Sequence, residues 1–305
     1  MDERFCTSRR VDLHLAYGGV DAVDLRLGAF QHTFSWMMAE FIQVENLRGY
    51  AWLRHGFSTR AGGVSTIYGG GSPGSLNLGW TKDDNPVLVR ENRRRFWNCV
   101  TGRAGQPGIT LQQMHGTEIH VLRTGHEPLE TREGHATLAG DGLMTGLPGM
   151  LLSIQTADCV PVMLVDVEQR VVAVLHAGWR GTVAGIAEQG VACMQREYGS
   201  RVEDMAAAVG PSIGSCCYTI GDEVREAFFA RFAYSTHLFH QDRLDLKEAN
   251  RRQLVEAGIP QEHVAVVKEC TGCARTPFGE RKYFSHRIDQ GFAGRMMSAI
   301  GVVEI

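Results

Sequence analysis

Short apolar segments bounded by turn-forming residues constrain the fold of this chain more than any other feature. They are rich in β-branched residues, and each is about as long as a typical strand. We expect strands at residues 109–113, 119–122, 150–156, 160–165 and 171–176, with a central sheet as their simplest home.

Helical patterns interleave irregularly with these segments. Asp84-Asn85-Pro86 is typical of a helix start and predicts a helix over 84–99. Further helices are expected at 181–198, 222–232 and 246–257, further strands at 50–59, 205–209 and 264–268, and a final helix or turn at 291–300. This order favours a mixed α/β or α+β fold over a doubly wound parallel sheet.

The size and composition are those of an ordinary globular protein. The 305 residues, 44% of them hydrophobic, suffice for one large domain or two small ones. No clear motif precedes about residue 45, so we expect a variable amino-terminal segment at 1–45 and a catalytic domain at 46–305.

Charge and hydropathy exclude several classes of partner. A formal net charge of -3 provides no basic field for a nucleic-acid backbone. No apolar stretch reaches the roughly 18 residues that span a bilayer, and the amino terminus lacks the apolar core of a signal peptide. We therefore expect a cytoplasmic protein, monomeric by default, that binds neither nucleic acid nor membrane.

Two histidines and one cysteine form a candidate metal site. His115, Cys159 and His176 lie in the tight motifs LQQMHG, TADCVPV and HAGWRG, each where an apolar run meets a turn-forming residue. Taken singly, each is more often a structural residue. Together they match the ligands of Zn²⁺, with the fourth tetrahedral position left open for catalysis. A single copper ion would also suit these ligands.

Charged residues in neighbouring loops suggest an anionic cosubstrate. Arg60, Arg180 and Arg287 lie beside glycine or serine, where a guanidinium could bind phosphate. Asn77, in the loop motif SLNLG, is a further candidate contact for substrate or phosphate. Arg180 also follows HAG and precedes a predicted helix, so phosphate is expected near residues 178–182. For each residue alone, a solvated or structural role is the simpler alternative.

Two aspartates are candidates for proton transfer or for orienting a histidine. Asp141 lies in AGDGLM and Asp158 precedes Cys159. Asp141 could instead form a turn, because Asp-Gly is a strong turn signal. An open metal site with these groups could run deamination of a purine or phosphorolysis of a nucleoside.

A Cys–His nucleophilic pair is the main alternative to a metal site. Cys159 would attack an acyl carbon, with His115 or His176 as the base. The other cysteines are expected to be mostly free thiols. Cys270 and Cys273 form a C-x-x-C motif without a second one, for which we expect a local structural role rather than redox chemistry.

The ordered motifs resemble those of the YfiH-type family, also labelled multicopper polyphenol oxidase or laccase-domain proteins. The resemblance spans about residues 50 to 300 and rests on GFSTRAGGVS, SLNLG, LQQMHG, DGLMT, TADCVPV, HAGWRG, GPSIGSCCYTIG, LDLKEANRRQL and YFSHR. It implies a single domain with layered α/β/β/α architecture, similar to that of a cysteine-dependent deamidase toxin. It also implies a metal held by His115, Cys159 and His176.

The resemblance leaves several activities open. It implies phosphorolysis of adenosine, inosine and S-methyl-5′-thioadenosine, with adenosine deamination as a side activity. Other members are described as peptidoglycan-editing factors, which makes an editing hydrolase an alternative, and a single-copper polyphenol oxidoreductase is another. The twelve histidines include no His-x-His pair and no second His/Cys cluster is evident, so four copper ions have no expected site.

Overall fold

A computed structural model describes residues 39–69, 74–106, 108–124, 129 and 134–304. Most of the expected variable segment at 1–45 therefore lies outside the described residues. The described chain starts just before β1 (Phe41–Ile42), which pairs antiparallel with β2 (Leu53–Ser58). The short helix α2 (Glu45–Arg48) connects these two strands.

The expected strands form two sheets instead of one central sheet. A five-stranded sheet has the order β1-β2-β13-β6-β3, and a six-stranded sheet has the order β12-β9-β7-β8-β5-β4. Both mix parallel and antiparallel pairs. The remaining strands are β3 (Gly108–Ile109), β4 (Ile119–Leu122), β5 (Gly142–Thr145), β6 (Leu151–Thr156), β7 (Val160–Asp166), β8 (Val171–Ala177), β9 (Met205–Val209), β12 (Val264–Val266) and β13 (Met296–Val302).

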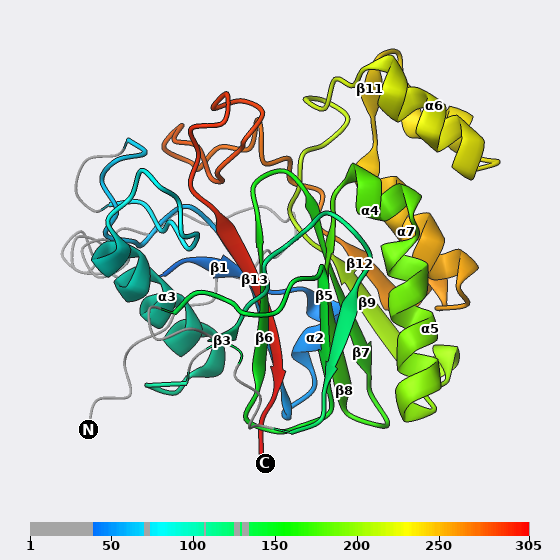
Figure 1. The fold of residues 1–305 in the computed structure, drawn as a ribbon, viewed down its shortest axis with the longest axis horizontal. Coiled ribbons are helices and arrows are strands. Elements are labelled where there is room, and N and C mark those ends of the chain that lie inside the picture. Colours follow the sequence, from blue (N-terminus) through cyan, green and yellow to red (C-terminus); the bar gives the residue numbers. More distant parts are fainter. Residues whose placement is uncertain (1–38, 70–73, 107, 125–128, 130–133, 305) are drawn as a thin grey trace, which may run out of the picture.

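Two sheets packed face to face, with helices outside them, give four layers (Figure 1). In β8, Val172 and Val174 pack between the sheets, while Val171, Ala173 and Leu175 face the outer helices. Burial on both faces explains why this strand is apolar from Val171 to Leu175. The expected layered α/β/β/α fold is confirmed.

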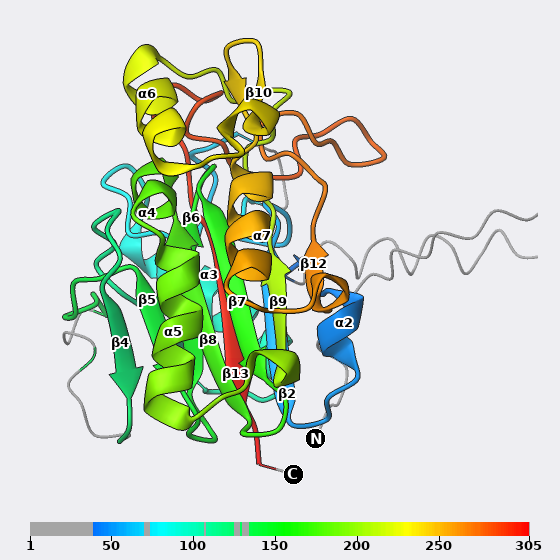
Figure 2. The ribbon, with the colours of Figure 1, turned by 90° about the vertical axis from the view of Figure 1, so that its right-hand side faces the viewer.

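The outer layers are built from helices with local start and stop signals. α3 (Pro86–Thr101) covers the five-stranded sheet (Figure 1). α5 (Ile186–Tyr198) and α7 (Leu246–Glu256) cover the six-stranded sheet (Figure 2). The Asn85 side chain accepts a hydrogen bond from the Val87 N–H and begins α3 as the sequence predicts. Within the described residues, no helix combines the length and apolar character needed to cross a membrane.

A smaller group of elements lies beyond one end of the six-stranded sheet. It contains α6 with the hairpin of β10 and β11, at the top of Figure 2. The remaining elements are α4 (Trp179–Val183), α6 (Asp222–Arg231), β10 (Phe239–His240), β11 (Arg243–Leu244) and the 3-10 helices Val202–Asp204, Ser235–Leu238 and Gln261–His263.

Two of the predicted secondary-structure elements differ in the structure. The final helix or turn at 291–300 is replaced in its second half by β13, the strand between β2 and β6. Met297 and Ala299 face α3 whereas Ile300 and Val302 face the other sheet, so both sides are buried and no amphipathic alternation marks the strand. The single helix expected at 181–198 is two helices, because Gly185 adopts a left-handed φ of 81° between α4 and α5.

Candidate metal centre

One edge of the six-stranded sheet brings the three sequence-predicted ligands together. β8 runs antiparallel to both β7 and β5, so the end of β8 meets the starts of β7 and β5. His176 lies at the end of β8, Cys159 immediately precedes β7, and His115 lies in the loop before β4. The fold therefore brings together three residues, His115, Cys159 and His176, that are far apart in sequence.

The ligand atoms of His115, Cys159 and His176 all lie within 4.8 Å of one another. The two imidazole rings meet edge to face, with centroids 4.8 Å apart and an interplanar angle of 77°. His176 is buried, Cys159 is partly buried and His115 is exposed. Two imidazoles and one thiol with one solvent-facing member fit a three-ligand zinc site that keeps an open position.

Asp141 is the residue that organises this centre. It is fully buried, and its Oδ1 lies 2.8 Å from His176 Nδ1, which leaves Nε2 of that ring as the ligand atom. The same carboxylate accepts the backbone N–H groups of His115 at 2.9 Å and Gly116 at 2.7 Å. A carboxylate that orients a metal-binding histidine is a recurrent feature of zinc sites.

Backbone conformation at the centre is unusual. His115 has φ 61° and Asp158 has φ 95°, both in the region that L-residues rarely occupy. Gly178 leaves room for the ligands, because a Cβ there would lie 3.1 Å from His115 Cδ2 and 3.2 Å from Cys159 Sγ. The first glycine of HAGWRG is thus explained by the close approach of His115 and Cys159.

Cys159 and His176 favour a thiolate beside an imidazolium. Burial alone would raise the pKa of Cys159, but His176 and His115 outweigh it and lower this pKa from 9.0 to about 6. Burial likewise opposes protonation of His176, but Cys159 and Asp141 raise its pKa from 6.5 to about 9. A thiolate is the form that binds a metal and also the form that acts as a nucleophile.

Asp158 is occupied by contacts away from the histidines. Its Oδ1 accepts the Thr271 hydroxyl at 2.6 Å, and its Oδ2 accepts the Arg287 backbone N–H at 2.7 Å. Its backbone carbonyl accepts the Ile213 N–H at 3.0 Å. These bonds fix the backbone next to Cys159 and connect it to two other loops.

Arg180 and Arg287 lie around a tyrosine near the centre. The guanidinium of Arg287 stacks over the Tyr218 ring at 5.2 Å and donates to the Thr219 carbonyl. Burial first, and then the nearby Cys159, raise the pKa of Tyr218 to about 12, whereas Arg287 and Arg180 oppose this. Tyr218 lies in the motif GPSIGSCCYTIG, but nothing in the sequence around it predicts that it lies near Cys159.

Arg60 and Asn77 take part in hydrogen bonds between loops. Asn77 is fully buried, donates to Asp84 Oδ2 at 2.7 Å and accepts the Arg295 backbone N–H at 2.9 Å. Arg60 donates to the Tyr68 and Gly69 carbonyls. The polar groups of Asn77 are thus bonded to protein within this network, and its role as a phosphate contact stays a prediction.

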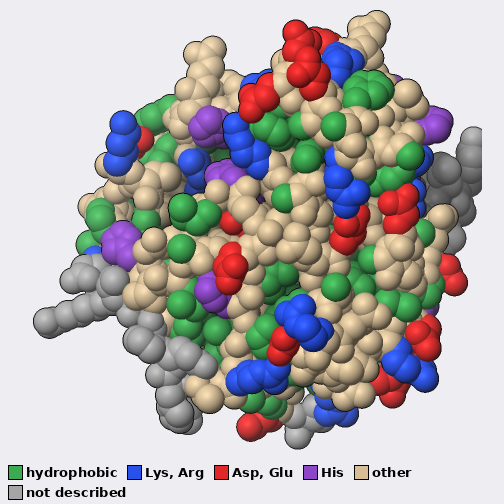
Figure 3. Space-filling model, turned by 45° about the vertical axis from the view of Figure 1, so that its right-hand side comes forward, with side chains coloured by type: hydrophobic (Ala, Val, Ile, Leu, Met, Phe, Trp, Pro, Cys, Tyr) green, Lys and Arg blue, Asp and Glu red, His purple; other side chains and the backbone are tan. Residues whose placement is uncertain are grey.

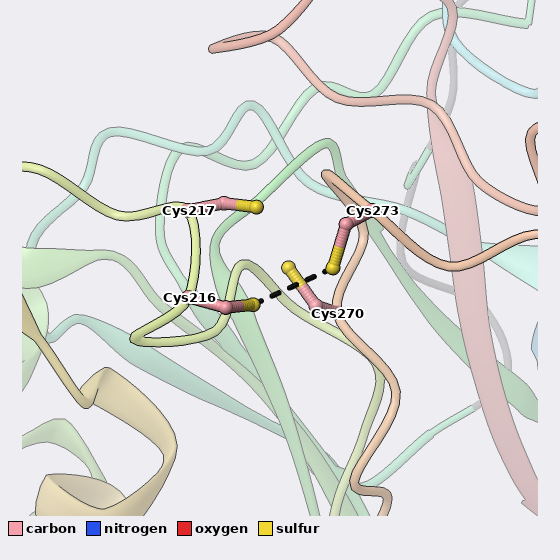
Figure 4. Close-up of side chains that lie close together, drawn as sticks. All are labelled: Cys216, Cys217, Cys270 and Cys273. Carbon is pink, nitrogen blue, oxygen red and sulfur yellow. Dashed lines mark hydrogen bonds between the residues drawn. The ribbon is translucent and has the colours of Figure 1, made fainter.

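A second cluster corrects the expectation that no further His/Cys site exists. Cys216, Cys217, Cys270 and Cys273 place their sulfur atoms within 4.8 Å of one another (Figure 4). The C-x-x-C motif therefore has a partner, which is the adjacent pair Cys216-Cys217. The sequence signal was present in GPSIGSCCYTIG, but nothing local indicated that the two motifs meet.

Comparison with known proteins decides the family. A family model described as multi-copper polyphenol oxidoreductase laccase matches residues 54–303. The chain belongs to this family. Relatives include purine nucleoside phosphorylase YlmD of Geobacillus stearothermophilus, 36% identical over 263 residues that cover 82% of this chain and 94% of the relative. Adenosine deaminase RL5, of an unknown prokaryotic organism, is 38% identical over 68% of this chain and 83% of its own.

Solved structures of the family confirm the fold. The crystal structure of YlmD from Geobacillus stearothermophilus superposes with a TM-score of 0.74, with 34% identity, and covers 86% of this chain and 94% of its own. The expected YfiH-type resemblance is thereby confirmed. The family description mentions several copper ions, but the described residues offer one mixed His/Cys cluster and one all-cysteine cluster.

Proposed function

We propose that the chain is a zinc-dependent purine nucleoside phosphorylase with adenosine deaminase side activity. Its substrates would be adenosine, inosine and S-methyl-5′-thioadenosine, each converted with phosphate to the free base and the ribose 1-phosphate, or its 5-methylthio form. The observation that carries the proposal is the convergence of His115, Cys159 and His176, with Asp141 orienting His176. The names of the relatives supply the reaction class.

The three ligands and their carboxylate partner have distinct proposed roles. When bound, zinc would supply a Lewis acid at this edge of the sheet. His115, Cys159 and His176 would hold it, and Asp141 would act as a positioning residue by fixing the tautomer and ring orientation of His176. Asp158 would position Cys159 from the adjoining turn through its bonds to Thr271 and Arg287.

Arg180 and Arg287 are the proposed phosphate contacts. Both are exposed, and both lie within electrostatic reach of Tyr218 beside Cys159. In phosphorolysis a phosphate oxygen bonds to C1′ of the ribose while the C1′–N9 bond breaks and the departing base takes up a proton. Guanidinium groups would hold and orient the phosphate for this displacement. Acidic and basic side chains are interspersed on the face shown in Figure 3, as suits a small ligand better than a polyanion.

Removal and return of the metal tests the proposal. Protein treated with a chelator should lose phosphate-dependent release of adenine from adenosine and regain it with zinc. The variant Cys159→Ala should lose the metal of this centre together with the activity, because it removes one of three ligands. Cys193→Ala is the matched control, since Cys193 is a buried cysteine of α5. Activity retained by Cys159→Ala with no metal at this centre would refute its proposed role.

A cysteine hydrolase that edits cell-wall precursors is the second candidate. It is favoured by the position of the Cys159 thiol, which lies within 4.8 Å of ring nitrogens of both His115 and His176. These histidines lower the pKa of Cys159 to about 6. Such an enzyme would need the thiolate free, so zinc would inhibit it instead of activating it. The chelation experiment separates the two candidates. The phosphorylase should be inactive without zinc, whereas the cysteine hydrolase should be active without it and should be inactivated when an alkylating reagent is added to the metal-free protein.

A further inference from the structure

The four-cysteine cluster lies where two neighbouring strands end. β9 and β12 are parallel neighbours, so the loops that follow them leave the sheet side by side. Cys216 and Cys217 lie in the loop after β9, and Cys270 and Cys273 in the loop after β12. A bridge between Ser212 and Cys270 extends the strand pairing into these loops.

The spacing of the sulfur atoms matches a metal site better than a disulfide. Cys216 Sγ and Cys273 Sγ are 3.4 Å apart, and all four sulfurs lie within 4.8 Å of one another (Figure 4). Four thiolates placed about 2.3 Å from a tetrahedral zinc are about 3.8 Å apart, whereas bonded sulfurs are about 2.05 Å apart. The four side chains come from two loops and point toward a common centre.

We propose that Cys216, Cys217, Cys270 and Cys273 form a second, structural zinc site of four thiolates. Four protein ligands would close the coordination sphere, unlike the open centre at His115, Cys159 and His176. This assignment does not rest on the proposed phosphorylase activity, because its four ligands have no role in the proposed reaction.

Backbone groups and glycines around the cluster support this assignment. The Gly214 N–H lies 3.1 Å from Cys270 Sγ, a contact that stabilises a metal-bound thiolate. A Cβ on Gly272 would lie 3.0 Å from Cys217 Cβ and 3.2 Å from its Sγ. A Cβ on Gly214 would lie 3.3 Å from Cys270 Cβ. Both glycines therefore allow the cysteines to converge.

Positive charge at the cluster complements the charge of a zinc tetrathiolate. The Lys247 side chain is only 6% exposed, and its Nζ donates to the carbonyls of Val267, Lys268 and Glu269. Lys247 also interacts electrostatically with Cys270 and Cys216. Zinc with four thiolates has a net charge of about −2, so a buried ammonium beside it is stabilised.

The proposed four-cysteine site would fix the loops after β9 and β12, which lie next to the His115–Cys159–His176 centre. Thr271, within the C-x-x-C motif, donates to Asp158 next to Cys159. Tyr218 follows Cys217 and lies beneath the Arg287 guanidinium. A metal that fixes these two loops would thus fix the backbone of Asp158 and the stacking of Arg287.

Metal analysis in a Cys159→Ala background tests the second site alone. Protein purified without oxygen, loaded with zinc and desalted should retain about one equivalent of zinc, because only the four-thiolate site remains. Cobalt loading should give the intense thiolate-to-metal and ligand-field bands of a tetrahedral tetrathiolate. The further changes Cys273→Ser or Cys216→Ser, at the two exposed sulfurs, should abolish both signals.

Cys99→Ala in the same background is the control, since Cys99 is a buried cysteine of α3, and it should leave the metal content unchanged. Circular dichroism would show that the variants remain folded. Absence of metal from folded Cys159→Ala protein would overturn the proposal. So would equal metal retention by the Cys273→Ser and Cys216→Ser variants, or a Cys216–Cys273 disulfide found by peptide mapping of the freshly purified protein.

Discussion

Asp141 is the residue on which the geometry of the candidate metal centre depends most. Its carboxylate contacts the His176 ring and accepts backbone N–H groups of the His115 loop, so one side chain positions two of the three proposed ligands. Asp141→Asn should lower zinc affinity about 10- to 100-fold, because an amide is a weaker acceptor for the imidazole N–H. Competition with a chromogenic chelator measures this affinity.

Asp166→Asn is the matched control for that change. Asp166 is equally buried and accepts the backbone N–H groups of Glu168 and Gln169 at 2.9 Å, but it lies at the far end of β7 from Cys159. Its replacement should affect stability without altering zinc affinity. Unchanged affinity in Asp141→Asn would show that His176 does not need this partner.

Gly178 provides a second test of the geometry of the candidate metal centre. Gly178→Ala should lower zinc affinity about tenfold, because a methyl group 3.1 Å from His115 and 3.2 Å from Cys159 displaces both ligands. Gly221→Ala is the control: this glycine also precedes a helix with an ordinary φ, and its Cβ would meet nothing within 4 Å. Equal affinities for the two variants, measured by chelator competition, would contradict the steric account.

The sequence predicts the residues of the site better than their contacts. His115, Cys159 and His176 could be found because each lies in a compact motif beside an apolar segment. Asn77 and Arg60 have the same loop context, yet their side chains serve the loop itself, which only the three-dimensional network reveals. The meeting of Cys216 with Cys273 likewise depends on the pairing of β9 with β12.

The break between α4 and α5 depends on the left-handed backbone conformation of Gly185, which a substitution can test. Gly185 has φ 81°, where an alanine is strained, and its Cβ would lie 3.0 Å from Glu188 Oε2. Gly185→Ala should therefore lower the free energy of unfolding by about 1 kcal/mol or more. Urea denaturation measures the change, with Gly49→Ala as control, since Gly49 has φ -71° and open space. Equal stability of the two variants would refute the strain.

His55 connects β2 to the start of α2 and makes this contact sensitive to pH. Its ring is 1% exposed, and Nε2 accepts the Val44 N–H at 3.1 Å, which only a neutral ring nitrogen can do. Burial first, and then the charge of Arg48, lower its pKa from 6.5 to about 4. The unfolded chain therefore binds the extra proton between these values, and stability present above pH 6.5 is lost as the pH falls toward 4.

Urea denaturation at pH 7 and pH 4.5 should show this loss. The wild type should lose on the order of 2 kcal/mol more than His55→Gln over this interval, because glutamine does not titrate. The difference between the two proteins isolates His55 from other groups that titrate in the same range. Identical pH dependence of the two would contradict a neutral buried His55.

Elements with local signals are predicted from the sequence, and elements that depend on distant partners are not. α3 begins at an asparagine cap, and α7 begins at Asp245, whose side chain accepts the Glu248 N–H, so both could be placed from the sequence. β13 contains serine, glycine and two methionines and is a strand only because β2 and β6 lie on either side of it. The assignment of strands to two sheets also depends on such long-range pairing.

At the scale of the whole molecule, two sheets and two cysteine-containing clusters are combined in one layered domain. The six-stranded sheet positions the candidate metal centre at the start of β7 and the end of β8, and the four-cysteine cluster lies beyond the ends of β9 and β12. Asp158 connects the two, because it precedes Cys159 and accepts a hydrogen bond from Thr271. The layered fold thus gives the two clusters a shared support.

We propose that this layered domain cleaves purine nucleosides with phosphate at the His115–Cys159–His176 centre. The test is to quantify the adenine and ribose 1-phosphate that zinc-loaded protein forms from adenosine as the phosphate concentration is varied. We expect equal amounts of the two products, formed only when phosphate is present. Zinc-loaded, folded protein that forms neither product from adenosine, inosine or S-methyl-5′-thioadenosine would contradict it.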